Sequence, residues 1–491
     1  MLTATPVTTS PATPAAYLIG ENMRVVLVQP NSASAVKSVL GATGVPLGLA
    51  YLAATLRDEH DVRVVDALTL DYTLDDLRRE FRKYEPDVVG VTATTPAIYD
   101  AYAVARLAKK LNPEVKTVVG GPHVTFTAEE TLAECEAIDV VVRGEGELTL
   151  KELLSAWERG LPLKGVGGIT FRHKSKIRSN EPRPLMKNLD ELPFPAYDLL
   201  PMKKYEISGH RFGNVMTSRG CPFKCIFCAS STLFGKKWRA RSPENVIDEL
   251  RLLRDEYGVR EIEFLDDTFT LSKKRAERIC DLMIRERLEI SWSCSSHVNT
   301  VSKKLAEKLK KAGCHSVYVG VESGSQRILD IIGKNTTLEK AERAVKTLKE
   351  AGLNVLASFI IGVPGETVST IKSTIRLAKK LKPTYAQFTL CTPFPGTKLF
   401  ELALKRGLLL TRNWARYTTL EPVMSIPGMT AEQLKKWLRK AYLSFYLRPR
   451  FLLEQILCRR FFVLKKALLG TLASLMTEAR GEKHGRNSID G

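Results

Sequence analysis

Cysteine is almost missing from the first 220 residues of the sequence, where Cys135 is the single thiol. The 491-residue chain has nine cysteines, and their positions form no even ladder of spaced pairs. This pattern excludes the disulfide framework of a small secreted protein and favours a reducing compartment with metal or redox chemistry. Residues 1–22 lack a basic head and carry prolines through their apolar part, so they make a poor secretory signal. We therefore predict a cytoplasmic protein with a flexible extension over 1–22, the alternative being that translation starts at Met23.

Acidic residues are scarce relative to basic ones, at 54 against 74, which gives a net charge of +20. Such a charge suits an acidic partner, which could be nucleic acid, anionic lipid head groups or an acidic electron-transfer protein. The alternative is the lysine- and arginine-rich surface of a thermophile protein. With 44% hydrophobic residues, the chain is expected to fold into two or three globular domains.

A fourth cysteine is missing where three others gather. Cys221, Cys225 and Cys228 are spaced C-x3-C-x2-C, and the neighbouring thiols along the chain are Cys135 and Cys280. No local thiol therefore completes a tetrahedral zinc site or a cluster site with four thiolates. Three ligands on a four-iron cluster would leave one iron open to a small molecule. The alternatives are a structural zinc completed by a distant residue, a disulfide, or buried free thiols.

Short valine-rich runs alternate with amphipathic stretches over residues 23–157. Such runs suit strands that are buried on both faces, and the intervening helices make crossovers, so we predict a five-stranded, parallel, doubly wound sheet (Rossmann- or flavodoxin-like). Ligands of these sheets bind at the carboxyl ends of the strands. The expected strands are 24–29, 62–66, 87–92, 117–120 and 138–143.

A second alternation of strands and helices follows a basic connector, 158–205, in which spaced prolines favour an extended linker. Over 206–430 we count six strand–helix units, two fewer than a closed barrel needs, so a partial (β/α)6 TIM barrel with one open side is predicted. The cysteine loop follows its first strand directly, at the end where parallel barrels carry their chemistry. The expected strands are 214–218, 261–265, 291–295, 316–321, 355–361 and 385–390.

The motifs of residues 214–400 resemble, in order, those of radical S-adenosylmethionine (SAM) enzymes. After the cysteine loop come FLDDTF at 264–269, ESGS at 322–325, GVPGE at 362–366 and TPFPGT at 392–397. The resemblance implies a [4Fe-4S] cluster held by the three cysteines, with SAM on the open iron. The residues that it places near SAM are Phe227, Asp266, Asp267, Glu322, Ser323, Gly362, Glu366 and Pro393.

The segment 23–157 resembles the cobalamin-binding domain that precedes many such enzymes, through GGPH-T at 120–125 and RGEGE at 143–147. The resemblance implies corrinoid contacts from Thr92, Thr94, Gly120, Gly121, His123, Gly144, Glu145 and Gly146. The D-x-H-x-x-G motif that often follows the first strand is missing, so we expect no histidine ligand from that loop. The alternatives are that His123 is a packing residue and that the domain has lost its cofactor.

The resemblance also implies the reaction. One electron from a low-potential donor, a flavodoxin or ferredoxin, would cleave SAM to a 5′-deoxyadenosyl radical, which takes hydrogen from an unactivated sp3 carbon. Proteins with this domain order include hopanoid methylases, archaeal tetraether ring-forming enzymes and the anaerobic cyclase of bacteriochlorophyll synthesis. We therefore expect carbon–carbon bond formation by methylation or ring closure.

The C-terminal segment 431–491 is predicted to be helical, basic and amphipathic. Charges interrupt 447–476 too often for it to span a bilayer, which needs about 20 predominantly apolar residues. Leucines and an isoleucine share one helical face, which Arg460 interrupts, so peripheral membrane contact and a hydrophobic, isoprenoid or membrane-lipid substrate are expected. The alternative is a helix packed across the open side of the barrel. The residues of the apolar face are Leu453, Ile456, Leu457, Leu464 and Leu468.

Three alternative functions remain open. One is a tetrapyrrole cyclase or another cobalamin-dependent methylase of small metabolites. Another is a tRNA methylthiotransferase, but its N-terminal domain needs three cysteines for a second cluster and this one has only Cys135, so a nucleic-acid partner is not expected. The third is a corrinoid carrier without catalytic activity, which leaves the ordered motifs of the barrel unexplained.

Overall fold

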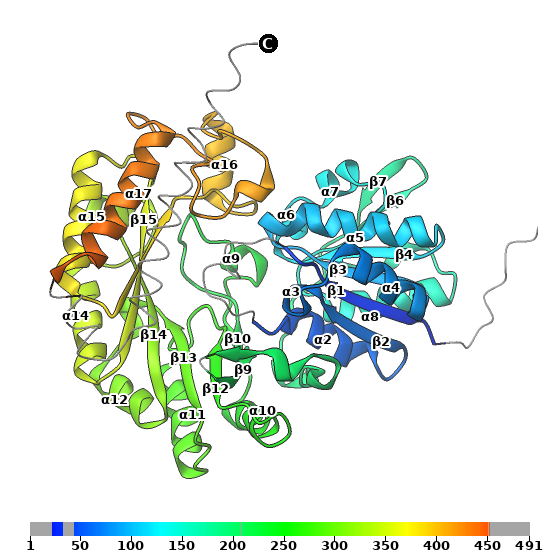
Figure 1. Ribbon diagram of the computed structural model, residues 1–491, viewed down its shortest axis with the longest axis horizontal. Coiled ribbons are helices and arrows are strands. Elements are labelled where there is room, and N and C mark those ends of the chain that lie inside the picture. Colours follow the sequence, from blue (N-terminus) through cyan, green and yellow to red (C-terminus); the bar gives the residue numbers. More distant parts are fainter. Residues whose placement is uncertain (1–21, 33–43, 208, 450, 452–491) are drawn as a thin grey trace, which may run out of the picture.

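The structure is a computed structural model that describes residues 22–32, 44–207, 209–449 and 451. Two α/β units lie side by side, the first on the right of Figure 1 and the second on the left. Each unit is built around a seven-stranded sheet. The predicted extension 1–22 lies, apart from its last residue, outside the described residues.

The first sheet has the strand order β2-β1-β3-β4-β5-β6-β7. Its first five strands are parallel and confirm the predicted doubly wound sheet. Because the order reverses between β1 and β3, the carboxyl ends of these two strands form the switch point where such sheets bind ligands. The five strands are β1 (Arg24–Gln29), β2 (Asp61–Asp66), β3 (Val88–Thr92), β4 (Lys116–Gly120) and β5 (Val140–Val142).

Helices cover both faces of this sheet because its valines are buried on both sides. Valines of alternating position divide between two apolar cores, so each face of the sheet has its own helices. One face packs against α2 (Leu47–Leu56) and α8 (Glu147–Glu158). The other packs against α4 (Leu74–Tyr84), α5 (Ile98–Leu111) and α7 (Ala128–Glu134).

The prediction of an extended linker over 158–205 is wrong for its first half. There β6 (Ile169–His173) and β7 (Lys176–Ser179) form an antiparallel hairpin that pairs with β5 and extends the first sheet. Ile169 and Phe171 are buried, whereas β7 is mostly exposed and basic. Only alternate residues of one short strand are therefore apolar, a weak signal in a sequence rich in lysine and arginine.

The second sheet has the order β16-β15-β14-β13-β12-β9-β8, in which β8 (Glu206–Ile207) is a short antiparallel addition. The other six strands are parallel and confirm the predicted partial barrel. They are β9 (His210–Val215), β12 (Glu261–Phe264), β13 (Ser291–Ser296), β14 (Cys314–Glu322), β15 (Asn354–Ile361) and β16 (Tyr385–Leu390). The helices on the outside, labelled in Figure 1, are α10 (Pro243–Asp255), α11 (Lys273–Arg285), α12 (Lys303–Lys311), α14 (Leu338–Glu350) and α15 (Val368–Leu381).

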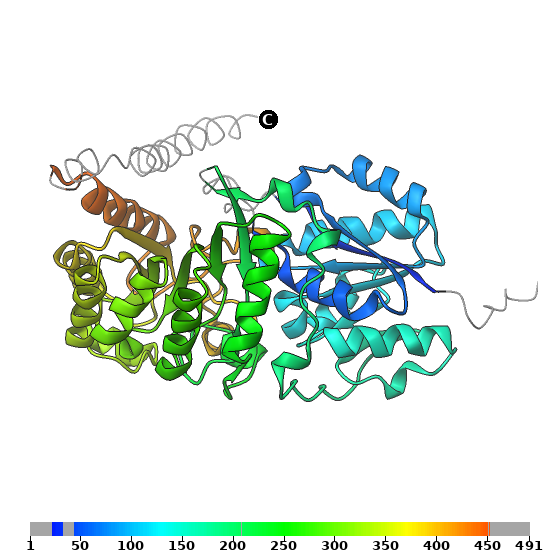
Figure 2. The ribbon, with the colours of Figure 1, turned by 90° about the horizontal axis from the view of Figure 1, so that it is seen from below.

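The two units share one apolar core. The face of the first sheet that carries α2 and α8 continues without a break into the core between the second sheet and its helices, and Figure 2 shows the close apposition of the units from below. Polar ties reinforce this boundary. The Asn214 side-chain oxygen accepts the Val45 N–H at 2.8 Å, and the Tyr205 hydroxyl donates to Asp66 at 2.8 Å.

A C-terminal helix covers the free edge of the second sheet. The helix α17 (Ala431–Tyr446) begins with a capping box formed by Thr430 and Gln433. The Tyr446 hydroxyl accepts the Ala386 N–H at 3.1 Å and donates to the Ala386 carbonyl at 2.9 Å. The Tyr442 hydroxyl makes the same pair of bonds with Phe388, at 3.2 and 2.8 Å. Two phenols thus take the place of a neighbouring strand along β16.

The helix α17 agrees with the first part of the predicted C-terminal segment. The apolar face expected over 447–476 lies outside the described residues, apart from 447–449 and 451. Within the described part of the chain, no helix has the length and apolarity that a membrane span requires.

Candidate functional site

The cysteine loop begins after β10 (Ser218–Arg219), close to the carboxyl end of the first barrel strand. Its three cysteines are free of disulfides and partly exposed. Backbone bonds fix the loop from three sides. Cys221 donates to the Gly235 carbonyl at 3.2 Å, Ile226 donates to Ile332 at 3.0 Å, and Leu399 donates to Ile226 at 2.9 Å.

Gly220 shows why the loop needs a glycine before its first cysteine. Its φ is +91°, and a Cβ there would lie 2.6 Å from the Lys237 carbonyl oxygen and 3.0 Å from that of Gly235. Gly333 is similar, because a Cβ would lie 2.8 Å from the Lys224 carbonyl. Close approaches of backbone to backbone therefore hold the loop on both sides.

The donor set suits an iron–sulfur cluster. Among the described residues, no three His, Cys, Asp or Glu side chains come together closely enough to hold a single metal ion. Cysteine thiolates are the usual ligands of clusters, which spread several irons over a larger volume. Burial raises the pKa of Cys225 to about 11, while the nearby Lys334 ammonium acts in the opposite direction. The thiols therefore fit a cluster, whose irons would deprotonate them.

The two predicted aspartates differ in their surroundings. Asp266 is buried and accepts the Thr217 N–H at 2.7 Å and the Thr217 hydroxyl at 2.6 Å, so it holds the chain just before the cysteine loop. Asp267 accepts a bond from the Ser230 hydroxyl at 2.6 Å, and Ser230 in turn accepts one from the Cys228 thiol at 3.3 Å. Burial raises the pKa of Asp267. Of the two carboxylates, Asp267 is the one beside the cysteines.

The predicted Glu322 forms a buried ion pair with Lys334, at 2.7 Å, and accepts the Ser358 hydroxyl at 3.2 Å. The φ angle of Glu322 is +67°, a backbone conformation that residues other than glycine rarely adopt. A Cβ on Gly320 would lie 2.1 Å from the Glu322 carboxylate, so the glycine makes room for the pair. The pair lies beside Cys225, whose thiol interacts electrostatically with both of its members.

The remaining predicted SAM residues lie around the same end of the barrel. Glu366 turns back on its own loop and accepts the Gly362 N–H at 2.6 Å, and burial raises the pKa of Glu366 to about 7. Ser323 packs its hydroxyl 3.3 Å from that of Thr374. Pro393 is buried, and Phe227 is partly buried against the shared core.

His297 is a residue of this site that the sequence analysis missed. It follows β13 directly, is 5% exposed, and its ring stacks on Phe223 of the cysteine loop at 3.8 Å between centroids. Its Nδ1 accepts the Asn299 N–H at 3.1 Å, and its Nε2 has no partner among the described residues. The available signal was a lone histidine at the carboxyl end of a barrel strand. Lys334, also missed, is twelve residues from Glu322 and gave no local signal.

The predicted cobalamin residues lie at the carboxyl ends of β3, β4 and β5 of the first sheet. A Cβ on Gly121, whose φ is +108°, would lie 2.7 Å from the Ala93 carbonyl, so β3 and β4 end in tight contact. Thr92 is partly buried there and Thr94 is exposed. Gly120 ends β4, and the Gly144 N–H donates to Thr125 at 3.1 Å. A narrow, glycine-rich edge of this kind leaves backbone accessible to a flat ligand.

His123 is 1% exposed and packs against the second unit. Its Nδ1 lies 3.2 Å from the Thr95 hydroxyl, and its ring meets the edge of Trp414 at 5.0 Å between centroids. Its Nε2 has no partner in the described part of the chain, and burial lowers the pKa of His123 to about 4. These contacts are those of a packing residue.

Glu145 and Glu147 reach across the boundary between the units. Arg219 contacts Glu145 at 3.1 Å and Glu147 at 2.5 Å, and Arg239 contacts Glu145 at 2.8 Å. Gly146 between the glutamates packs on Leu52 of α2, since a Cβ there would lie 3.2 Å from that side chain. The RGEGE loop therefore touches the chain that leads into the cysteine loop.

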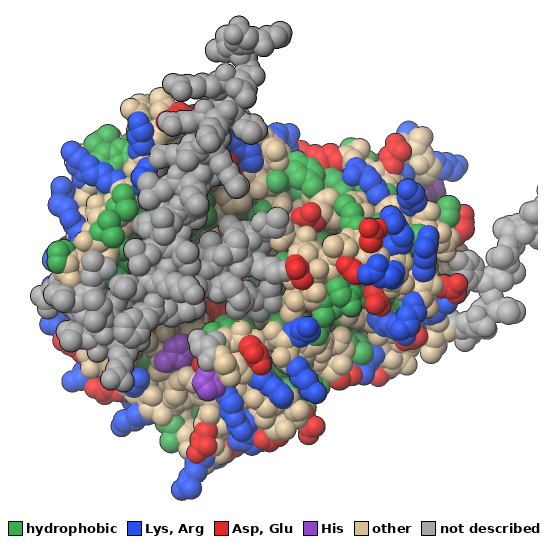
Figure 3. Space-filling model, in the orientation of Figure 1, with side chains coloured by type: hydrophobic (Ala, Val, Ile, Leu, Met, Phe, Trp, Pro, Cys, Tyr) green, Lys and Arg blue, Asp and Glu red, His purple; other side chains and the backbone are tan. Residues whose placement is uncertain are grey.

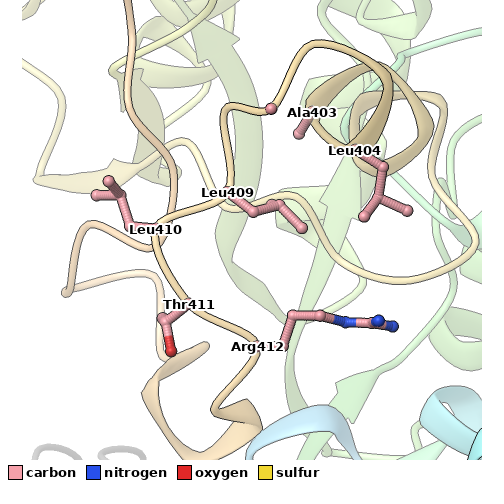
Figure 4. Close-up of a pocket in the computed structure, with 7 residues that line it drawn as sticks. Ala403, Leu404, Leu409, Leu410, Thr411 and Arg412 are labelled. Carbon is pink, nitrogen blue, oxygen red and sulfur yellow. The ribbon is translucent and has the colours of Figure 1, made fainter.

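A shallow pocket of about 270 Å³ lies apart from these residues, on and after α16 (Lys398–Lys405). Figure 4 shows the residues that line it, and none of them belongs to the predicted site. The pocket is lined by Ala403, Leu404, Gly407, Leu409, Leu410, Thr411 and Arg412.

The surface charge is mixed. On the face of the molecule in Figure 3, Lys and Arg are scattered over both units with Asp and Glu among them. The basic charge forms no single stripe on that face.

Comparison with known proteins decides the family. Residues 215–378 match the model of the radical SAM superfamily, and residues 33–154 match that of the B12 binding domain. The chain is 55% identical to an uncharacterized methyltransferase of Pyrococcus horikoshii over 450 residues, which are 92% of this chain and 98% of that protein. This chain belongs to the B12-binding radical SAM family. The predicted radical SAM core, cobalamin-type domain and enzymatic class are confirmed.

Other members of the family are also similar to this radical SAM protein. An anaerobic magnesium-protoporphyrin IX monomethyl ester cyclase of Rubrivivax gelatinosus is 33% identical over 88% of this chain and 78% of the cyclase. The solved radical SAM methyltransferase TsrM of Kitasatospora setae, with cobalamin and a [4Fe-4S] cluster bound, has the same fold. Its TM-score is 0.69 at 20% identity, with 88% of this chain and 90% of TsrM covered. The family contains both methylases and cyclases.

Proposed function

We propose that this radical SAM protein forms a carbon–carbon bond, by methylation or ring closure, on a hydrophobic substrate of the isoprenoid or membrane-lipid class. The observation that carries the proposal is the contact of Arg219 with Glu145 and Glu147. It brings the glycine-rich edge of the B12 binding domain next to the cysteine loop. Two reactive centres at that boundary would act on one substrate.

The residues of the chain have distinct tasks in this reaction. Cys221, Cys225 and Cys228 would hold the cluster. When bound, the cluster and SAM supply a carbon-centred radical that can take hydrogen from an unactivated carbon, and cobalamin supplies a methyl group or tunes the outcome. Asp267 and the Glu322–Lys334 pair line the cysteines with fixed charges that orient a zwitterionic cosubstrate.

The surroundings of the site support exclusion of water. The buried ring of His297 stacks on the partly buried ring of Phe223 in the cysteine loop. Asp266 holds Thr217, which is buried just before the cysteine loop. Radicals survive long enough to react with the intended carbon only where water and competing donors are kept out.

The lipid class is supported by the sequence of the C-terminal segment. Residues 447–476 are predominantly apolar with basic residues interspersed. This combination suits a protein that acts at the surface of a membrane from the cytoplasm.

The decisive experiment compares lipids and metabolites of a strain that lacks the gene with those of the parent and of a strain carrying Cys225→Ala. We expect a methylated or cyclised lipid to disappear in the deletion and Cys225→Ala strains alike. In vitro, reduced protein given SAM should release 5′-deoxyadenosine. Unchanged lipids together with altered water-soluble metabolites would overturn the lipid class. Persistent absence of 5′-deoxyadenosine with an intact cluster would overturn the radical reaction and favour the corrinoid carrier.

Membrane contact has its own test. Full-length protein should float with liposomes that contain anionic lipid, and a variant without residues 447–491 should stay in the unbound fraction. Equal recovery of both proteins in the unbound fraction would contradict membrane contact. A flotation that disappears in high salt would assign the contact to the basic residues.

A tetrapyrrole substrate is the second candidate, favoured by the 33% identity to the Rubrivivax gelatinosus cyclase. Magnesium-protoporphyrin IX monomethyl ester offered to the reduced protein distinguishes the two proposals, because ring closure changes its absorption spectrum.

For the tRNA alternative, Cys135 is 1% exposed and has no neighbouring cysteine in the first unit. That unit therefore cannot hold a second cluster on three cysteines.

A further inference from the structure

Four buried charged side chains meet at the boundary between the two units. Arg219 and Arg239 come from the second unit, and Glu145 and Glu147 come from the first. The exposed fractions of the side chains are 3% for Arg219, 6% for Arg239, 8% for Glu145 and 7% for Glu147. Their charges cancel, and Arg219 bridges both glutamates.

The arginines and the glutamates of this charge cluster adjoin or belong to loops of different cofactor sites, the cysteine loop and the RGEGE loop. Arg219 precedes the first predicted cluster ligand, Cys221, by two residues, and only Gly220 separates them. Glu145 lies between the glycines of the RGEGE loop, and Glu147 begins α8. A shift of either loop therefore changes the ion pairs of the other.

Further contacts fix the cluster in place. Arg239 lies on β11 (Arg239–Ala240), which pairs with β10 so that Arg219 faces Arg239 across the two strands. Arg239 also donates to the Met186 carbonyl at 2.6 Å and to the Phe234 carbonyl at 2.8 Å. The other oxygen of Glu145 accepts the Met186 N–H at 2.8 Å. The terminal nitrogens of both arginines and both oxygens of Glu145 thus have partners, whereas the buried Nε atoms of Arg219 and Arg239 have none in the described part of the chain.

The four charged side chains link the positions of the two loops, because separating any one of them from its partners leaves a buried charge unpaired. A buried charge that loses its partner is strongly unfavourable, so the two loops either keep their relation or move together. When one cofactor orders its loop, the other loop loses conformational entropy as well, so the second cofactor loses less entropy when it binds. Two ligands linked in this way raise each other's affinity by the same factor.

We propose that Arg219, Glu145 and Glu147 couple the two cofactor sites, so that an assembled iron–sulfur cluster tightens the binding of cobalamin and bound cobalamin protects the cluster. The three side chains act as positioning residues, since they contact loops and not reacting atoms. The inference rests on the proposed function, because it needs both cofactors to bind.

The test measures the dissociation constant of hydroxocobalamin for full-length protein with and without an anaerobically reconstituted cluster. We expect wild-type protein with the cluster to bind cobalamin about fivefold more tightly or better, at the lower end of usual couplings. Loss of iron to a chelator should also slow when cobalamin is present. A ratio of one in both wild-type measurements overturns the coupling, even if no variant folds.

The variants Glu147→Gln and Arg219→Lys should bring the affinity ratio towards one while both cofactors still bind. Glu249→Gln is the matched control, because it removes a buried carboxylate that pairs with Arg241 inside the second unit. An unchanged ratio in the folded Glu147→Gln protein, or an equal loss in the control, overturns the inference. Absence of any cobalamin binding by wild-type protein would instead overturn the proposed function together with the coupling.

Discussion

At the scale of single residues, the site depends on backbone geometry as much as on side chains. Glycines before the first cysteine and beside the Glu322–Lys334 pair occupy positions that no Cβ could share. The cysteines gain their orientation from these contacts. Substitution of a cysteine removes a cluster ligand, whereas substitution of a glycine changes the conformation of the loop, so the two effects can be measured separately.

The variant Cys225→Ala removes one cluster ligand. After anaerobic reconstitution we expect about four irons per wild-type chain and almost none in the variant, because two thiolates hold a cluster poorly. Iron and sulfide analysis with absorption spectra gives the measurement. Cys280→Ala, which removes a buried thiol outside the loop, is the control and should keep its iron. One zinc per wild-type chain without iron would contradict the cluster.

The variant Gly220→Ala should lose cluster without losing any ligand. The left-handed backbone alone costs about 1–2 kcal/mol for a residue other than glycine, and the new Cβ would also lie 2.6 Å from a carbonyl oxygen. Gly407→Ala is the control, since its φ is +63° and nothing lies within 4 Å of its Cβ position. We expect reduced iron content in Gly220→Ala only. Equal iron content in both variants would show that the loop adapts.

His123 should make the protein sensitive to mild acid. Its pKa falls from 6.5 to about 4 on burial, so between these values the unfolded chain binds more protons than the folded one. Stability should therefore drop, by about 1–3 kcal/mol, as the pH falls from about 6.5 towards 4. Urea unfolding at several pH values measures this slope, and His123→Gln should make it shallower, while the buried His297, whose pKa burial lowers to about 3, keeps part of it. A slope that is the same in both proteins would assign the sensitivity to other groups.

At the scale of elements, the strands were more predictable than the connections between them. Valine runs such as those of β1 and β3 are buried on both faces and stand out in the sequence as continuous apolar stretches, and the barrel strands stand out because they alternate with helical patterns. The hairpin of β6 and β7 was missed because one of its strands is exposed and basic. The roles of His297 and Arg219 depend on residues far away in the sequence, which no local pattern reveals. Asp266 and Asp267 look equivalent in sequence, and only the fold separates their surroundings.

The two tyrosines of α17 should contribute to stability through the edge of β16. Tyr442→Phe and Tyr446→Phe each remove two hydrogen bonds to the backbone, and each should cost about 1–3 kcal/mol of unfolding free energy. Chemical denaturation measures the loss. Tyr99→Phe is the control, because its hydroxyl accepts one long bond of 3.4 Å and the residue is 41% exposed. Losses no larger than in this control would mean that water replaces the phenols.

At the scale of the whole molecule, the two units share a core, and they should unfold together. Cys135 of the first unit and Cys280 of the second are buried to 1% and 0% exposure, so their thiols report unfolding of each unit separately. We expect both to become reactive towards a thiol reagent at the same urea concentration. Leu56→Ala in the shared core should lower that concentration for both thiols equally. Two separate transitions would show that the units fold independently.

The tyrosine contacts along β16 also bear on how the length of this chain can vary in evolution. Four residues of a helix advance about 6 Å, and two residues of a strand advance about 6.6–6.8 Å. Tyr442 and Tyr446 can therefore meet Phe388 and Ala386 at the same time only in this alignment. A residue inserted or deleted between Tyr442 and Tyr446, or between Ala386 and Phe388, would take at least one hydroxyl away from its backbone partner. Residues 398–430, which follow the predicted SAM motif, can change length without disturbing the match. Related sequences should accordingly place their insertions and deletions in that stretch and keep the tyrosine spacing constant.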